Sequence, residues 1–120
     1  DALLAAQKFL LQSRAEAGDA DAKWALVPVE WAMTGQRPSA RDLDEAVGTY
    51  EGRALVRTSG GLAYHWRERF VLALDPIGKD LFAVQGTDDY RFRLVRTNGA
   101  VVGLERVWKS GETAAYRRLN

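Results

Sequence analysis

The sequence predicts an α+β fold, in which N-terminal helices precede a curved antiparallel sheet or partly open β-barrel of about seven strands. Three observations predict this fold. The first part of the chain is rich in Ala and Leu, which favour helices. From residue 48 onward, apolar residues recur at every second position, which is the period of a half-buried strand. Glycines, often beside Asn, Asp or Ser, separate these short runs, as they do between strands joined by tight turns.

The first expected helix runs over about residues 2–17, with its leucines on one broad face. Gly18 is expected to end it, because glycine readily adopts the left-handed conformation that terminates helices. Asp19 or Asp21 can then cap a second helix by accepting hydrogen bonds from its free backbone amides. This region therefore predicts two consecutive helices with a short connection.

The second helix presents one apolar face, which comprises Trp24, Val27 and Trp31. Pro28 is expected to kink or restart this helix, because proline removes a backbone donor. Gly35 should end it. Ser39 is the expected N-cap of a third, short helix over residues 40–46, with Asp42 in its first turn.

The seven expected strands lie at about 50–57, 62–67, 70–75, 82–84, 90–95, 102–108 and 113–118. Turns are expected between them at 58–61, 76–79, 86–89, 98–99 and 110–111. Asn98-Gly99 is the strongest hairpin signal, because both residues tolerate a positive φ. Val102, Leu104 and Trp108 are expected to share one face of their strand. We treat residues 1–47 as a helical segment and residues 48–120 as a β-meander within one folding unit, since neither part alone buries much core.

The composition excludes several classes of site. The chain has 120 residues, no cysteine, one histidine and a formal net charge of +1, so disulfides, thiolate metal sites and a strong field for nucleic acid are ruled out. No apolar run is long enough to span a bilayer. Asp88-Asp89 is interpreted as a solvated turn, and His65 as an exposed strand residue. No serine lies in a nucleophile elbow, so we predict no catalytic residue, metal or cofactor.

Arginines are expected on the polar positions of the strands, namely Arg53, Arg57, Arg67, Arg91 and Arg93. Strict alternation places Tyr90 and Phe92 on the opposite face. A surface that binds single-stranded nucleic acid needs cations and aromatic rings on the same face. We therefore expect a solvated charged face and no nucleic-acid partner.

Aromatic side chains gather on the predicted inner face of the sheet: Tyr64, Trp66, Phe70, Phe82, Tyr90, Phe92 and Trp108. One interpretation is that they form a core packed against the N-terminal helices, as in most small barrels. The alternative is that they line a ligand cavity. In that case the candidate ligand-binding residues are Tyr64, Trp66, Tyr90, Phe92 and Trp108.

Several motifs of the strand region resemble one family. Residues 46–53 (Ala-Val-Gly-Thr-Tyr-Glu-Gly-Arg) are similar to a Tyr-x-Gly-x-Tyr-x-x-Arg pattern, with Val47 at its first tyrosine. Further similar segments are 62–64, 74–82 and the long run 91–104 with its Asn-Gly turn. The pattern resembles the C-terminal lipocalin-like β-domain of bacterial tail-specific (tricorn-like) serine peptidases and penicillin-binding-protein-like serine hydrolases. The resemblance covers about residues 22–118.

This resemblance implies a non-catalytic accessory domain, structural or regulatory, of a larger bacterial serine peptidase or hydrolase. Its partner would be an upstream catalytic domain of the same polypeptide, which holds the serine and lysine, and its location would be periplasmic or secreted. The chain begins at Asp1 rather than Met, so we expect a longer precursor or parent. The alternative function is a small-molecule-binding lipocalin-like domain that uses the aromatic interior. An independent enzyme is a third alternative.

Overall fold

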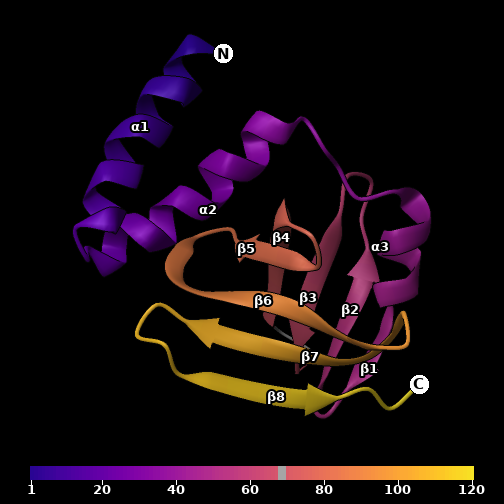
Figure 1. Ribbon diagram of the computed structural model, residues 1–120. Coiled ribbons are helices and arrows are strands. Elements are labelled where there is room, and N and C mark those ends of the chain that lie inside the picture. The colour runs from indigo at the N-terminus through magenta and orange to yellow at the C-terminus, as the bar shows by residue number, and fades with distance from the viewer. Residues whose placement is uncertain (68–69) are drawn as a thin grey trace. The chain divides into compact units, whose positions relative to one another are not determined.

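The computed structural model of the protein describes residues 1–67 and 70–120, without the side chain of Phe70. The described chain divides into two compact units, Asp1–Arg37 and Pro38–Asn120. The first unit is helical. The second unit holds a short helix and the whole sheet (Figure 1).

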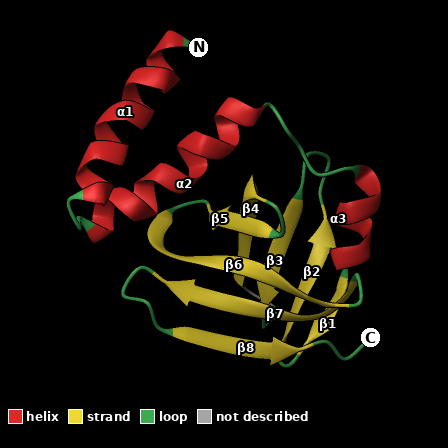
Figure 2. Ribbon diagram, viewed as in Figure 1, coloured by secondary structure: helices red, strands yellow, loops and turns green. Residues whose placement is uncertain are grey.

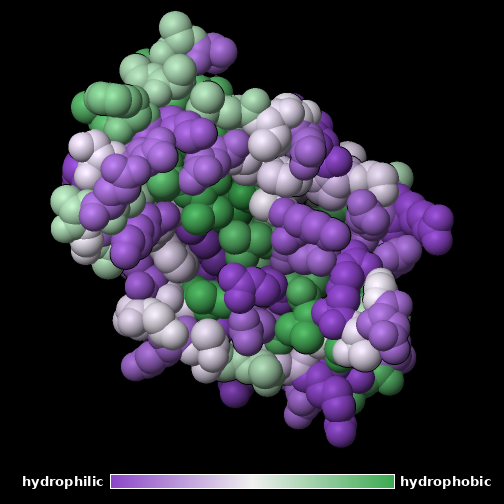
Figure 3. Space-filling view, viewed as in Figure 1, coloured by the Kyte–Doolittle hydropathy of each residue, from purple (hydrophilic) through white to green (hydrophobic). Residues whose placement is uncertain are grey.

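The first unit contains α1 (Ala2–Glu16) and α2 (Ala20–Thr34), which pack against each other. Asp19 is the N-cap of α2, as one of our two alternatives predicted, and its carboxylate accepts the Ala22 N–H at 3.1 Å. Gly35, in the left-handed conformation, ends α2. The restart expected at Pro28 is wrong, because α2 continues through it. The turns on both sides and the packing on α1 hold the helix despite the missing donor. Exposed apolar side chains gather over α1 (green in Figure 3).

The second unit is an antiparallel sheet in which every strand pairs with its neighbour in the sequence (Figure 2). Its strands are β1 (Gly48–Tyr50), β2 (Arg53–Arg57), β3 (Leu62–Trp66), β4 (Phe70–Gly78), β5 (Leu81–Val84), β6 (Thr87–Thr97), β7 (Ala100–Trp108) and β8 (Thr113–Arg117). The sheet curls until its two edges meet. The Leu119 N–H donates to the Thr49 carbonyl at 2.8 Å, and the Glu51 N–H donates to the Arg117 carbonyl at 3.1 Å. The predicted α+β class is confirmed, with a sheet nearly closed into a barrel.

The described residues contain eight strands rather than seven, because the expected strand over 50–57 is two strands. Glu51 and Gly52 form a tight turn, and Gly52 has φ +77°, which favours glycine. Tyr50 therefore pairs with Arg53 across the turn. The alternation predicted through this segment is wrong, and Arg53 lies on the same face of the sheet as Tyr50.

Of two other turn predictions, one is confirmed and one is wrong. Asn98 and Gly99 have φ +51° and +84° and join β6 to β7 as expected. The turn expected at 76–79 instead falls at Lys79 and Asp80, because β4 continues past Pro76 with a bulge. Pro76 is tolerated because pairing with β3 ends at Leu74, so this part of β4 has a free side.

A second bulge changes which valine of β7 faces inward. The register shifts between Val95 and Arg96, so that Gly103 pairs with Val95 and Val101 pairs with Arg96. Val101 is consequently buried, whereas Val102 is 38% exposed. Our expectation that Val102 shares the inner face with Leu104 is therefore wrong, because a bulge interrupts the two-residue period.

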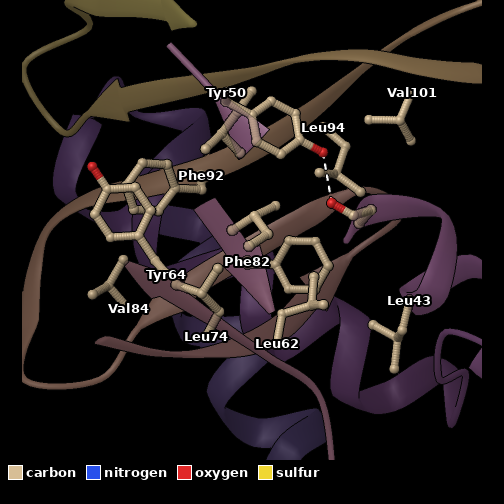
Figure 4. Close-up of a cluster of buried hydrophobic side chains, with 13 residues drawn as sticks. Leu43, Tyr50, Leu62, Tyr64, Leu74, Phe82, Val84, Phe92, Leu94 and Val101 are labelled. Carbon is tan, nitrogen blue, oxygen red and sulfur yellow. Dashed lines mark hydrogen bonds between the residues drawn. The ribbon is translucent and has the colours of Figure 1, made fainter. Parts of the chain in front are cut away.

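The core fills the barrel between the sheet and α3 (Ala40–Ala46), as Figure 4 shows. Ser39 caps α3 with the reciprocal Ser39–Asp42 hydrogen bonds of a capping box. The buried cluster consists of Leu43, Ala46, Tyr50, Leu55, Leu62, Tyr64, Leu74, Phe82, Val84, Phe92, Leu94, Val101 and Leu104. Because Asp44 and Glu45 bind arginines beside the β2–β3 and β6–β7 turns, α3 lies at that end of the barrel.

Tyr50 links this core to α3. Its hydroxyl donates to the Ala46 carbonyl at 2.6 Å inside the protein (dashed in Figure 4). Burial raises the pKa of Tyr50 above its usual value of 10.0, because the apolar surroundings disfavour the phenolate. The hydroxyl therefore stays protonated and keeps its role as a donor.

Candidate functional site

A group of charged and aromatic side chains occupies the end of the barrel interior opposite α3. The strand register places its members on the inner face: Tyr64 is opposite Leu55, and Phe92 is opposite Arg106. We call this group the arginine–aromatic cluster, and it consists of Arg53, Tyr64, Tyr90, Phe92, Arg106, Trp108 and Tyr116. Five strands contribute to it: β2, β3, β6, β7 and β8.

Arg53 enters the cluster from the start of β2. Its Nε donates to the Tyr64 hydroxyl at 3.0 Å, and its Nη1 donates to the Glu51 carbonyl at 2.7 Å. Its guanidinium carbon lies 3.5 Å from the centre of the Tyr116 ring. The guanidinium is therefore stacked on one ring and hydrogen-bonded at the edge of another, which restricts its rotamers.

Arg106 enters from β7 and lies among four rings, those of Tyr64, Tyr90, Phe92 and Trp108. Its guanidinium carbon is 4.7 Å from the centre of the Tyr90 ring, 5.2 Å from that of Phe92 and 5.3 Å from that of Trp108. Its Nη2 donates to the Tyr64 hydroxyl at 3.0 Å. Its Nε is buried and has no hydrogen-bond partner among the described residues. Arg106 thus retains an unused donor within a largely aromatic environment.

The rings of the cluster pack in defined geometries. Tyr64 and Phe92 are stacked with centroids 4.4 Å apart, and Tyr90 meets the Phe92 ring edge-on at 5.8 Å. Tyr90 and Trp108 lie 6.4 Å apart with tilted planes. Tyr64 and Phe92 are fully buried, whereas Tyr90 and Trp108 are only half-buried. Tyr64 and Phe92 therefore form the buried part of the cluster, and Tyr90 and Trp108 form the part that solvent can reach.

The charges of the cluster are not balanced within the described part of the chain. Other arginines of the barrel have carboxylate partners, such as Arg57 with Asp44 at 2.9 Å and Arg96 with Asp80 at 2.9 Å. No described carboxylate lies within ion-pair distance of Arg53 or Arg106. Both cations instead donate to one neutral hydroxyl. A partly buried cation costs free energy unless an anion or several acceptors compensate for the lost water.

Comparison with protein-family models, with curated proteins and with solved structures finds no match to this chain.

The structure brings together four of the five residues that the sequence predicts as ligand-binding: Tyr64, Tyr90, Phe92 and Trp108. The fifth, Trp66, pairs with Arg53 across β2 and β3 and is 37% exposed. The guanidinium carbon of Arg67 lies 4.7 Å from the Trp66 ring. The side chain of Phe70, which we also expected to point inward, lies outside the described residues.

Sequence reasoning missed Arg53, Arg106 and Tyr116. We placed Arg53 on the polar face opposite the aromatic rings, which is wrong because the Glu51–Gly52 turn reverses the alternation there. Arg106 could have been found, since it lies midway between Leu104 and Trp108 in the two-residue period. An arginine in an inward-facing series is the signal that was available.

The other positions considered as sites, His65 and the acidic pair at 88–89, do not gather a comparable group of functional side chains. His65 is half-buried on the outer face, where it pairs with Ala54 and Val71. Asp88 lies 3.8 Å from both Arg91 and Lys109. In residues 1–67 and 70–120, no three His, Cys, Asp or Glu side chains are placed to hold a metal ion. None of the described helices is long and apolar enough to cross a membrane.

Proposed function

We propose that the barrel unit binds a small molecule at the arginine–aromatic cluster. One observation supports this function above others: two guanidiniums and five rings converge at one end of the barrel interior, without a described carboxylate. Small-molecule sites are typically aromatic and contain a few converging polar groups. The cluster has this composition.

The half-buried rings and the polar groups of the cluster can contact different parts of a ligand. Tyr90 and Trp108 are half-buried, so a planar or apolar body can pack against them without unfolding the core. Arg53, Arg106 and the Tyr64 hydroxyl offer polar contacts within the same cluster. The remainder of the interior is closed by the buried side chains near α3. The ligand expected here is therefore small.

The first test is ligand-induced thermal stabilisation of the full chain with a panel of small aromatic and aliphatic compounds. A compound present at about ten times its Kd, and bound only by the native state, should raise the melting temperature by roughly 5 °C. Trp108→Ala and Tyr90→Ala should each remove that shift while the circular dichroism spectrum stays that of a folded barrel. Thermal melts with and without each compound provide the measurement.

Val107→Ala is the matched control, because Val107 neighbours Trp108 on the same strand but alternates to the other face. It should keep the full ligand shift. If the shift persists in both the Trp108 and the Tyr90 variant, the ligand binds elsewhere and the proposed site is wrong. If no compound of the panel stabilises the wild-type chain, the binding function itself is rejected.

A second candidate is the accessory role in a larger bacterial serine peptidase or hydrolase, exported to the periplasm or secreted. One observation favours it: residues Asp1–Arg37 form a compact helical unit of their own, with exposed apolar side chains on α1. Apolar surface of this kind is typical of segments that contact another domain. This role is compatible with ligand binding, because an accessory domain can carry a regulatory site.

The mass of the native gene product tests the accessory role. An antibody raised against the barrel, followed by intact-mass determination from the source cells, should detect a product several times heavier than 13.3 kDa. Deletion of this region from that product should change its hydrolase activity or solubility. A native product near 13.3 kDa would contradict the accessory role.

A further inference from the structure

We infer that the arginine–aromatic cluster recognises the carboxylate group of a small aromatic or aliphatic acid. This inference rests on the proposed binding function and specifies the class of ligand. It follows from three features of the cluster: its uncompensated charge, its unused donors and the shape of its aromatic walls.

The charge of the cluster calls for an anion. Arg53 Nε and Arg106 Nη2 each lie 3.0 Å from the Tyr64 hydroxyl oxygen, so the two donors are within two hydrogen-bond lengths of each other. Two like charges at this separation repel, and partial burial weakens the screening by water. An anion bound by both guanidiniums would attract each of them, and this attraction would outweigh the repulsion between them. Arginine is also the side chain best suited to planar, two-point recognition of carboxylates.

Donors remain available for such a ligand. Arg106 Nε is buried and has no partner among the described residues. The Tyr64 hydroxyl accepts from both arginines, yet no described acceptor lies within hydrogen-bond distance of its own proton. A hydroxyl can donate one hydrogen bond in addition to those it accepts. A carboxylate, which only accepts, is therefore complementary to the groups that converge here.

The rings limit what the carboxylate can be attached to. The half-buried rings of Tyr90 and Trp108 stand beside Arg106, and Tyr116 stands beside Arg53. These faces favour an apolar or aromatic body and offer few hydrogen bonds to a strongly hydrated one. A free inorganic anion would leave the rings unused. The ligand class is therefore a monocarboxylic acid with a small apolar body.

The experiment compares acids with neutral counterparts of the same shape on the full chain. Isothermal titration calorimetry at neutral pH would use phenylacetate and hexanoate, phenylacetamide and hexanamide, and inorganic phosphate. We expect each carboxylate to bind at least ten-fold more tightly than its neutral counterpart. A charge-assisted hydrogen bond accounts for a factor of that size. Inorganic phosphate should bind more weakly than either carboxylate.

Variants then place the carboxylate. Arg106→Gln and Arg53→Gln should each weaken carboxylate binding at least ten-fold while the affinity for the neutral counterparts stays unchanged. A purely structural role for these arginines would weaken both classes equally. Arg93→Gln is the matched control, since Arg93 lies on the outer face of β6 and pairs with Glu105. It should leave both affinities unchanged.

Each alternative result has a definite meaning. Equal affinity for acids and neutral compounds would overturn this inference and leave the binding function standing. Carboxylate binding that survives both glutamine variants would place the anion elsewhere and also overturn it. Absence of binding by every compound would reject the inference together with the proposed function. Because the comparison of acids with neutral compounds uses the wild-type chain, it holds even if one variant fails to fold.

Discussion

Phe92→Ala is expected to lower the free energy of unfolding by about 4 kcal/mol. Phe92 is fully buried, stacks on Tyr64 at 4.4 Å and contacts the edge of the Tyr90 ring at 5.8 Å. In the register it faces Phe82 on β5 and Arg106 on β7. Its removal creates a cavity directly beside a cation, which the neighbouring strands can close only in part. The loss therefore includes both transfer and cavity costs.

Urea unfolding of the full chain, followed by circular dichroism in the β-sheet region, measures this effect. Phe92→Leu keeps most of the apolar volume and should cost roughly half as much. Val71→Ala is the matched control, because Val71 lies on the same sheet with 56% of its surface exposed. It should change stability by less than about 0.5 kcal/mol. If Phe92→Ala costs no more than this control, the packing described here is wrong.

Arg118→Ala is expected to destabilise the barrel by about 3 kcal/mol, since one guanidinium serves several backbone acceptors. Arg118 Nη1 donates to the Glu45 carbonyl at 2.7 Å, Nη2 to the Val47 carbonyl at 2.7 Å and Nε to the Asn120 carbonyl at 2.8 Å. Its Nη1 is also 3.3 Å from the Val101 carbonyl. The side chain thus joins the end of α3, β7 and the C-terminus where the sheet closes.

The reason for this cost is the loss of partners for several carbonyl groups at once. The carbonyls at the end of α3 also carry the negative end of its dipole, which favours a cation there. Arg118→Lys retains the charge but cannot reach acceptors in several directions, so it should recover only part of the stability. Arg117→Ala is the control, because Arg117 is exposed and its backbone N–H, not its side chain, binds Glu51.

The same urea titrations measure the Arg118 series. Arg118→Ala should unfold at a clearly lower urea concentration than Arg117→Ala. Equal midpoints for the two alanine variants would show that the closure depends on the backbone pairs of β1 and β8 alone. An Arg118→Lys variant as stable as the wild type would show that charge, rather than the forked geometry of the guanidinium, is what matters.

Local sequence signals predicted most of the elements. The N-caps at Asp19 and Ser39, the stop at Gly35 and the Asn98-Gly99 turn are all where the sequence places them. These features depend on side-chain-to-backbone hydrogen bonds or on a positive φ within a few residues. Such interactions are complete within one short segment, so no distant contact can easily change them.

Errors arose where two segments had to be aligned with each other. The turn at Gly52 and the bulge between Val95 and Arg96 each shift the two-residue period by one position. A shift of one position moves every following side chain to the opposite face. For this reason Arg53 and Val102 were placed on the wrong faces, and β1 and β2 were predicted as one strand.

In the candidate site, too, the residues that follow local periodicity could be predicted, whereas those that depend on strand alignment could not. Four of its aromatic residues could be predicted, because they repeat with strand periodicity around an apolar face. The position of Arg53 beside Tyr64 and Tyr116 could not, because β2, β3 and β8 meet there only through the curvature of the sheet.

The sequence by itself determined the α+β class, the helices with their caps, and most of the side chains that form the interior. Only the tertiary structure decided that the sheet closes through Arg118 and the ends of β1 and β8, and that two arginines share one buried hydroxyl. The physical reason is the distance along the chain over which each interaction acts. Propensity, capping and alternation act within a few residues, whereas closure and convergence depend on the register and twist accumulated over all eight strands.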